Sequence, residues 1–174
     1  LGGETAAKLW VMVSGWGLGV LFYVLARRHL ERAWALGGVL LLMTTPAVVY
    51  SAGTGQVEVR LAAFALLSAY AVAMSAHEDA DPPHGFGWVI VAALAAGFFA
   101  GAKSTGLIFA FAVCISMLGR TVPFKRMCVF SICVALAGVQ WYAFNWSQTG
   151  DPLYPLLWRH VDLAAGYPWN DALA

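Results

Sequence analysis

The hydrophobic residues of this 174-residue chain gather in long, nearly continuous runs separated by short polar segments. Most of the runs approach the roughly 17–25 residues that a helix needs to cross about 30 Å of hydrocarbon. They are too long and too continuous for alternating barrel strands, and a helix pairs its own backbone polar groups within lipid. The pattern therefore predicts about six membrane-spanning helices, near residues 9–26, 34–50, 57–76, 86–102, 105–118 and 127–146.

The composition agrees with a membrane protein and excludes several other classes. Of all residues, 61% are hydrophobic and 11% are charged, whereas soluble domains have about 45–50% apolar and about 25% charged residues. A net charge of +1 leaves no broad basic field of the kind that nucleic-acid binding needs. The expected fold class is an all-α polytopic membrane protein, in contact with membrane lipids and with no nucleic-acid partner.

Basic residues in two of the short loops indicate the orientation of the helices. Short cytoplasmic loops carry an excess of Lys and Arg, so we expect these two loops to lie in the cytoplasm. Strict alternation then puts residues 51–56, the Lys103–Ser104 turn and everything after Trp146 outside. We expect a transmembrane domain over 1–146 and an extracytoplasmic loop region over 147–174. The basic residues are Arg27, Arg28 and Arg32 in the first loop, and Arg120, Lys125 and Arg126 in the fifth.

Two charged residues lie about one turn inside the third predicted helix. Arg60 reaches the interface easily with its long side chain, whereas the shorter Glu58 prefers a wet cavity. Glu58 is therefore either a functional carboxylate or a satisfied interfacial charge. We select Glu58 as the candidate catalytic residue and Arg60 as a candidate substrate-binding residue.

Lys103 is isolated between two apolar runs, with the uncharged residues 85–102 before it and 104–119 after it. Its ammonium must therefore lie at the outer surface or in a cavity there. A cation in such a place either binds a lipid-linked phosphate as a point charge or anchors a helical hairpin against sinking into the bilayer.

Small residues before the turn at Lys103 predict close packing of the helix over 86–102 against the helix over 105–118. They are Ala95, Ala96, Gly97, Ala100, Gly101 and Ala102.

A polar and aromatic segment follows the last predicted helix. Residues 149–155 read Thr-Gly-Asp-Pro-Leu-Tyr-Pro, which indicates a turn. Asn145, Asp151 and Tyr154 are candidate substrate-binding residues, because they combine polar groups with an aromatic face that suits a sugar or an isoprenoid. The aromatic residues are equally typical of a membrane-interface belt. They are Trp141, Tyr142, Trp146, Tyr154 and Trp158.

Several common chemistries have no signal in this chain. There is no phosphate-binding glycine loop, no serine-hydrolase elbow and no His-Glu-x-x-His pair. The histidines are scattered over loops and the cysteines lie inside apolar runs, so we expect neither a metal site nor a disulfide framework from them. The histidines are His29, His77, His84 and His160, and the cysteines are Cys114, Cys128 and Cys133.

The order of four features resembles bacterial members of the GT-C membrane glycosyltransferases, which include protein O-mannosyltransferases and lipid A aminoarabinose transferases. Residues 4–9, Glu-Thr-Ala-Ala-Lys-Leu, lead into a first helix that ends Leu-Ala-Arg-Arg. Pro46 precedes a loop and an acidic helix start, and a Gly/Ala-rich helix end precedes Lys103. The last feature is Asn145-Trp146 followed by the segment 149–155. Glu58 and Asp151 stand where these relatives usually carry Asp and Asn.

This resemblance implies a GT-C-like fold and the transfer of a sugar from a polyprenyl-phosphate donor to a lipid, glycan or protein acceptor. The reaction would take place at the outer face of the bacterial inner membrane. Lys103 would stabilise the departing phosphate, and Glu58 would orient the acceptor, a divalent metal or a loop. A divalent metal is the one cofactor that the resemblance leaves open. The sequence indicates neither the sugar nor the oligomeric state.

Two other functional classes stay open at this point. A transporter would also carry polar residues at membrane depth, often with broken helices in two corresponding halves. A non-catalytic structural subunit would use the outer loops to bind a partner. Because Leu1 is not a start methionine and no signal peptide follows it, we interpret the chain as an internal piece. The resemblance places the main catalytic aspartate of the family before Leu1.

Overall fold

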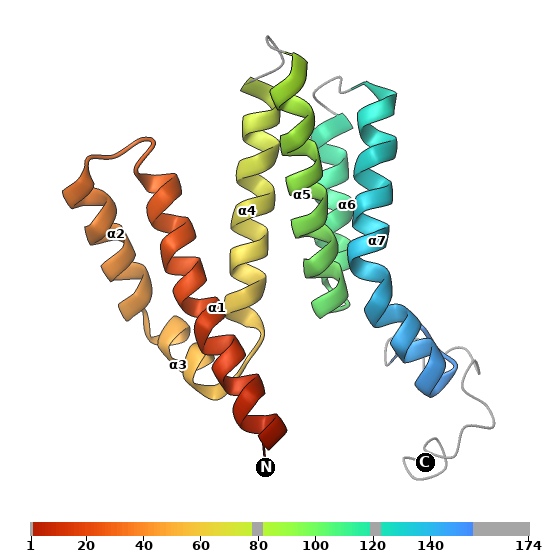
Figure 1. The fold of residues 1–174 in the computed structure, drawn as a ribbon, viewed down its shortest axis with the longest axis horizontal. Helices are drawn as coiled ribbons and strands as arrows, with labels where there is room; N and C mark the ends of the chain where they lie inside the picture. Colours follow the sequence, from red (N-terminus) through yellow and green to blue (C-terminus); the bar gives the residue numbers. More distant parts are fainter. Residues whose placement is uncertain (1, 78–81, 119–122, 155–174) are drawn as a thin grey trace. The chain divides into compact units, whose positions relative to one another are not determined.

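The computed structural model describes residues 2–77, 82–118 and 123–154, and these ranges are helical with no strand (Figure 1). The chain divides into two compact units, residues 1–67 and 68–174, and one helix, α4, contributes to both. The described ranges contain the helices α1 (Gly2–Ala26), α2 (Arg32–Thr44), α3 (Pro46–Thr54), α4 (Glu58–His77), α5 (Pro82–Ala102), α6 (Gly106–Leu118) and α7 (Phe124–Thr149).

Four of these helices contain stretches that are long and apolar enough to cross a membrane, namely Lys8–Ala26, Glu58–Ser75, Gly85–Ala102 and Phe124–Thr149. The pair α2 and α3 is a fifth candidate span if it counts as one element. The 13-residue α6 rises only about 20 Å, less than the hydrocarbon core of about 30 Å. The described helices therefore fit a multi-pass membrane protein with four or five full-length spans, where the sequence predicted about six.

Many large apolar side chains point away from the helix contacts. Trp16 is 67% exposed on α1, Ile108 is 72% exposed on α6 and Leu136 is 69% exposed on α7. A soluble monomer rarely exposes so much contiguous apolar surface. In a bilayer these side chains face lipid, which explains why exposed positions are as hydrophobic as buried ones.

The second predicted helix, over 34–50, is broken in the structure. Thr45 has extended backbone angles, and Pro46 begins a new helix at an angle of 59° to α2. Proline has no N–H and restricts the residue before it to extended conformations. The Thr45 N–H donates a hydrogen bond of 3.2 Å to Leu42 O, and the Thr45 hydroxyl donates one of 2.9 Å to Leu41 O. The threonine thus satisfies carbonyls that the break leaves without helical donors.

In the first unit, α1 packs against both halves of this broken element. A Cβ added at Gly19 would lie 3.1 Å from Met43 Sδ, and one at Gly38 would lie 3.0 Å from the Phe22 ring. Small residues therefore set the spacing of α1 and α2. The loop between them is closed by a hydrogen bond of 2.7 Å from Arg27 Nη1 to Leu30 O.

In the second unit, α5 is the central helix, with contacts to α6 and α7 (Figure 1). Ser68 on α4 donates a hydrogen bond of 3.0 Å to Ala92 O on α5, and Phe99 stacks on Phe109 of α6 with ring centroids 4.7 Å apart. The core is made mostly of small and medium-sized apolar residues. They are Ala71, Val72, Val89, Ala92, Ala93, Ala96, Ala110, Val113, Met117, Met127 and Phe130.

The small residues of α5 also contact a helix other than the predicted one. A Cβ at Gly97 would lie 2.6 Å from Val134 O, and one at Gly101 would lie 3.3 Å from Gly138 Cα, both on α7. The sequence had assigned these glycines to the pairing of 86–102 with 105–118. These two glycines allow the backbones of α5 and α7 to approach closely, and Gly106 allows the same close approach between α6 and α5.

Candidate functional site

Lys103 lies in a short turn between α5 and α6, and its side chain is exposed. Its N–H donates to Phe99 O at 3.3 Å, and its carbonyl accepts from Gly106 N–H at 2.8 Å. Gly106 packs directly on the end of α5, because a Cβ added there would lie 2.5 Å from Ala100 Cα. The turn is therefore fixed by backbone contact, and it holds the only cationic residue of the segment 85–118.

An apolar cavity of about 220 Å³ lies beside this turn. Residues on either side of Lys103 in the sequence, Ala100 and Leu107, form part of its wall. The Tyr142 hydroxyl donates a hydrogen bond of 2.8 Å to Ala100 O, which turns its polar atom toward α5. The turn that carries Lys103 and an apolar cavity thus lie next to each other at one end of α5. The full lining is Ala100, Leu107, Val134, Ala135, Gly138, Val139 and Tyr142.

The end of α7 is closed by a network of short hydrogen bonds. Gly150 has φ of 71°, a left-handed conformation that glycine adopts without steric cost. Its N–H donates to Trp146 O at 2.9 Å. The Thr149 hydroxyl lies 2.8 Å from Asn145 O and accepts from Asp151 N–H at 3.2 Å. These bonds fold the chain back so that the following residues cover the last turn.

The structure brings together three of the predicted substrate-binding residues, Asn145, Asp151 and Tyr154. Asn145 is 6% exposed, and its Nδ2 lies 3.5 Å from Tyr154 O. Tyr154 N–H donates to Asp151 O at 3.3 Å. Asp151 is completely buried, and its Oδ1 accepts a hydrogen bond of 2.8 Å from Leu153 N–H. The Oδ2 atom of Asp151 has no hydrogen-bond partner among the described residues.

Lys103 and this loop belong to the same end of the second unit. The hydrogen bond from Tyr142 to Ala100 and the contact of Gly101 with Gly138 place the end of α5 beside α7. From Gly138 the helix α7 continues to Thr149, a rise of about 16 Å (Figure 1). This outer part carries an exposed aromatic surface, which suits a membrane interface or a stacked ligand. Its members are Trp141, Phe144 and Trp146.

Glu58 and Arg60 lie in the first unit, at the beginning of α4. Glu58 is exposed in the first turn, where the helix dipole stabilises a negative charge. Arg60 is partly buried, and its Nε has no hydrogen-bond partner within the described part of the chain. Both positions agree with a structural role as well as with a functional one.

Lys8 on α1 is a residue that sequence reasoning did not select for the site. A Cβ at Gly55, which has φ of 80°, would lie 3.2 Å from Lys8 Cγ. The Gln56 N–H donates to Ser51 O at 3.1 Å and closes the end of α3. Lys8 therefore lies against the loop that leads into Glu58. Its place in the segment Glu-Thr-Ala-Ala-Lys-Leu is the sequence feature that could have indicated it as a candidate residue.

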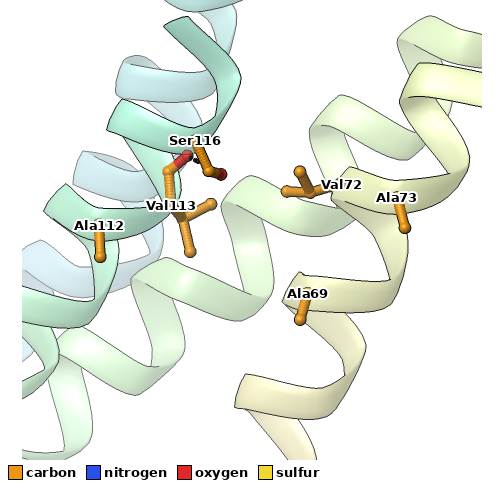
Figure 2. A pocket seen from close by; sticks show the side chains of 6 residues that line it. All are labelled: Ala69, Val72, Ala73, Ala112, Val113 and Ser116. Carbon is orange, nitrogen blue, oxygen red and sulfur yellow. Dashed lines mark hydrogen bonds between the residues drawn. The ribbon is translucent and has the colours of Figure 1, made fainter. Parts of the chain in front are cut away.

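A second cavity, of about 320 Å³, lies between α4 and α6. Figure 2 shows Val72 and Val113 pointing toward each other across it. The hydroxyl of Ser116 donates to Val113 O at 2.7 Å on its own helix, so the lining offers little to a polar ligand. The small side chains of Ala69, Ala73 and Ala112 complete the wall. This cavity takes no part in the candidate site.

Other predictions concern metals, cysteines and the loops. Within 2–77, 82–118 and 123–154, no group of three or more His, Cys, Asp or Glu side chains is arranged to hold a metal ion. The three cysteines are free thiols. Arg120, the acidic residues 78–81, and residues 155–174 with Trp158 and His160 lie outside the described residues.

Comparison of this chain with protein-family models, with curated proteins and with solved structures finds no match. The strongest local feature is the cationic turn at Lys103 next to an apolar cavity.

Proposed function

We propose that this chain is part of a GT-C-type membrane glycosyltransferase, which moves a sugar from a polyprenyl-phosphate donor to an acceptor at the extracytoplasmic face of the bacterial inner membrane. The observation that carries this proposal is the position of Lys103 beside the apolar cavity of about 220 Å³. A donor with an anionic head and an apolar chain needs this combination of a cation and a hydrophobic surface.

Lys103 would bind the phosphate of the donor. An ammonium group binds phosphate as a point charge, and a charge held in place stabilises a leaving group that gains negative charge. Gly106 and Ala100 fix the backbone of the turn, so the point from which the Lys103 side chain extends is set before the donor binds.

The loop at the end of α7 would form the polar side of the site. Asn145, Asp151 and Tyr154 are held together by the hydrogen bonds at this end, and exposed aromatic rings nearby offer faces for a sugar. In the proposed reaction the bond between the sugar and the phosphate breaks, and the phosphate keeps the electron pair. The acceptor oxygen forms the new bond and gives its proton to a carboxylate base.

Transport is a second candidate function, and the broken helix favours it. α2 and α3 meet at 59°, and broken helices form substrate sites in many transporters. Such transporters carry breaks in two corresponding halves, whereas within the described residues one bent pair of this kind is found. We therefore rank transport below glycosyl transfer.

Binding of radiolabelled polyprenyl phosphate to the full-length protein in detergent tests the role of Lys103. We expect Lys103→Ala to weaken binding by about 10-fold or more, because a charge-assisted contact contributes about 1.5–3 kcal/mol. Arg32→Ala is the matched control, since Arg32 is an exposed basic residue at the start of α2. Equal affinity of wild type and Lys103→Ala would overturn this role.

A further inference from the structure

A third cavity, of about 300 Å³, lies where the first turns of α5 and α7 meet in the second unit. Its wall is formed by Phe86 of α5, by Pro123 at the cap of α7, and by Lys125 and Arg126 in the first turn of α7. The volume is at the lower end of the range for ligand pockets. Because Pro123 and Lys125 are exposed, a ligand can reach this cavity from outside the helices.

The depth of this cavity in a bilayer follows from the two helices that form it. α5 and α7 run in the same direction and begin at the same end of the unit (Figure 1). Their membrane-spanning stretches, Gly85–Ala102 and Phe124–Thr149, also begin at this end. The beginning of a span lies at the boundary between the hydrocarbon and the phospholipid headgroups. A ligand in this cavity is therefore at the depth of the headgroups, at the opposite end of α5 from Lys103.

The charge at this end of the unit is positive. Lys125 and Arg126 are adjacent, and the beginning of α7 adds the partial positive charge of the helix dipole. The first turn of α7 contains no acidic residue. Among the described residues of the second unit, Asp151 is the one acidic residue, and it follows the opposite end of α7. The cavity therefore suits an anionic group, and a zwitterionic headgroup, whose amine the two cations repel, fits it less well.

We propose that this cavity binds the phosphate headgroup of an anionic phospholipid. Basic pockets between membrane-spanning helices recognise such headgroups. The guanidinium of Arg126 can pair with two phosphate oxygens, and the ammonium of Lys125 acts as a point charge. Phe86 in the wall and Phe124, which is 84% exposed, offer apolar surface to the first carbons of the acyl chains. This inference does not depend on the proposed function.

Native mass spectrometry of the full-length protein in detergent tests this proposal, because it counts the lipid molecules bound to each chain. Phosphatidylglycerol and phosphatidylcholine with the same acyl chains are added separately after copurified lipid has been removed. We expect phosphatidylglycerol to bind more tightly than phosphatidylcholine. The double variant Lys125→Gln, Arg126→Gln should bind phosphatidylglycerol about 25-fold more weakly, since each basic residue near a membrane surface contributes about fivefold in affinity.

Two further double variants separate a specific site from general attraction by positive charge. Arg28→Gln, Arg32→Gln removes the same charge from the exposed first basic loop and should leave the affinity for phosphatidylglycerol nearly unchanged. Lys125→Arg, Arg126→Lys keeps both charges and should bind like wild type. Circular dichroism shows whether each variant is folded.

Three outcomes of this experiment would overturn the proposal. The first is equal affinity of wild type for the two lipids. The second is an equal loss of affinity for phosphatidylglycerol in the two charge-removing variants, or no loss in either. The third is displacement of bound phosphatidylglycerol by inorganic phosphate alone, which would show that the cavity binds the free anion and not a lipid.

Discussion

The hydroxyl of Tyr142 on α7 lies 2.8 Å from the backbone carbonyl of Ala100 on α5 and donates a hydrogen bond to it. This contact joins two helices at the level of the Lys103 turn, and both residues line the cavity of about 220 Å³. It therefore fixes the width of the cavity at the end nearest to Lys103.

Replacement of Tyr142 by Phe removes this hydrogen bond and leaves the ring in place. We expect Tyr142→Phe to lower the free energy of unfolding by about 1–2 kcal/mol, because Ala100 O loses a donor in an apolar setting. The measurement is unfolding of the purified protein in mixed micelles, followed by circular dichroism. Tyr50→Phe, at a side chain that is 62% exposed, is the control, and an equal effect of the two variants would contradict the structural role.

Glycines at the contacts of α5 should not tolerate a methyl group. A Cβ at Gly97 would lie 2.6 Å from Val134 O, and one at Gly106 would lie 2.5 Å from Ala100 Cα. Because backbone atoms must move in both cases, we expect each Gly→Ala substitution to destabilise the protein by about 1–3 kcal/mol. Both are measured by the same unfolding assay.

Two other glycines serve as matched controls for this prediction. Gly17 in α1 and Gly37 in α2 have no neighbouring atom within 4 Å of an added Cβ. There, Gly→Ala should stabilise the helix by about 0.5–1 kcal/mol, since alanine has the higher helix propensity. Equal effects on stability at all four positions would mean that close packing at Gly97 and Gly106 does not cause the destabilisation.

Pro46 should be the cause of the 59° bend between α2 and α3. In Pro46→Ala the N–H becomes available for Leu42 O, so we expect a straighter helix over 32–54. Spin labels at exposed positions 36 and 53 would then move apart, and pulsed electron resonance measures that distance. An unchanged distance would show that packing against α1, and not the proline, imposes the bend.

The orientation predicted from the basic loops can be measured by cysteine labelling in intact cells. With the native cysteines replaced by alanine, we expect Ser104→Cys and Ser147→Cys to react with an impermeant maleimide from outside. His29→Cys should react only after lysis. The reverse pattern would place Lys103 in the cytoplasm and would contradict the proposed reaction at the outer face.

The helical class could be predicted because hydrophobic length is a direct consequence of bilayer thickness. The break at Pro46 could also have been anticipated, since the residue stands in the middle of an apolar run. The hydropathy pattern concealed it because apolar residues flank Thr44, Thr45 and Pro46 on both sides. Likewise, α6 was predicted close to its observed limits, but its 13 residues fall short of a full span.

The geometry of the candidate site could not be predicted to the same degree. The choice of α7 as the partner of Gly97 depends on three-dimensional packing that a single sequence does not encode locally. The burial of Asp151 depends on the positive φ of Gly150 and on the position of the Thr149 hydroxyl. The sequence identified Asn145, Asp151 and Tyr154 as candidates, and the contacts among them became visible only in the structure.

The measurement that tests the proposed function most directly is sugar transfer by the full-length protein in proteoliposomes. Radiolabelled polyprenyl-phosphate sugars serve as donors, and wild type is compared with Lys103→Ala and Glu58→Gln, with Arg32→Ala as the control. We expect transfer by wild type and Arg32→Ala, and a loss of about 10²-fold or more in kcat/KM for Lys103→Ala. A folded wild-type protein that transfers no sugar from any such donor would contradict the glycosyltransferase account and would favour a transporter or a structural subunit.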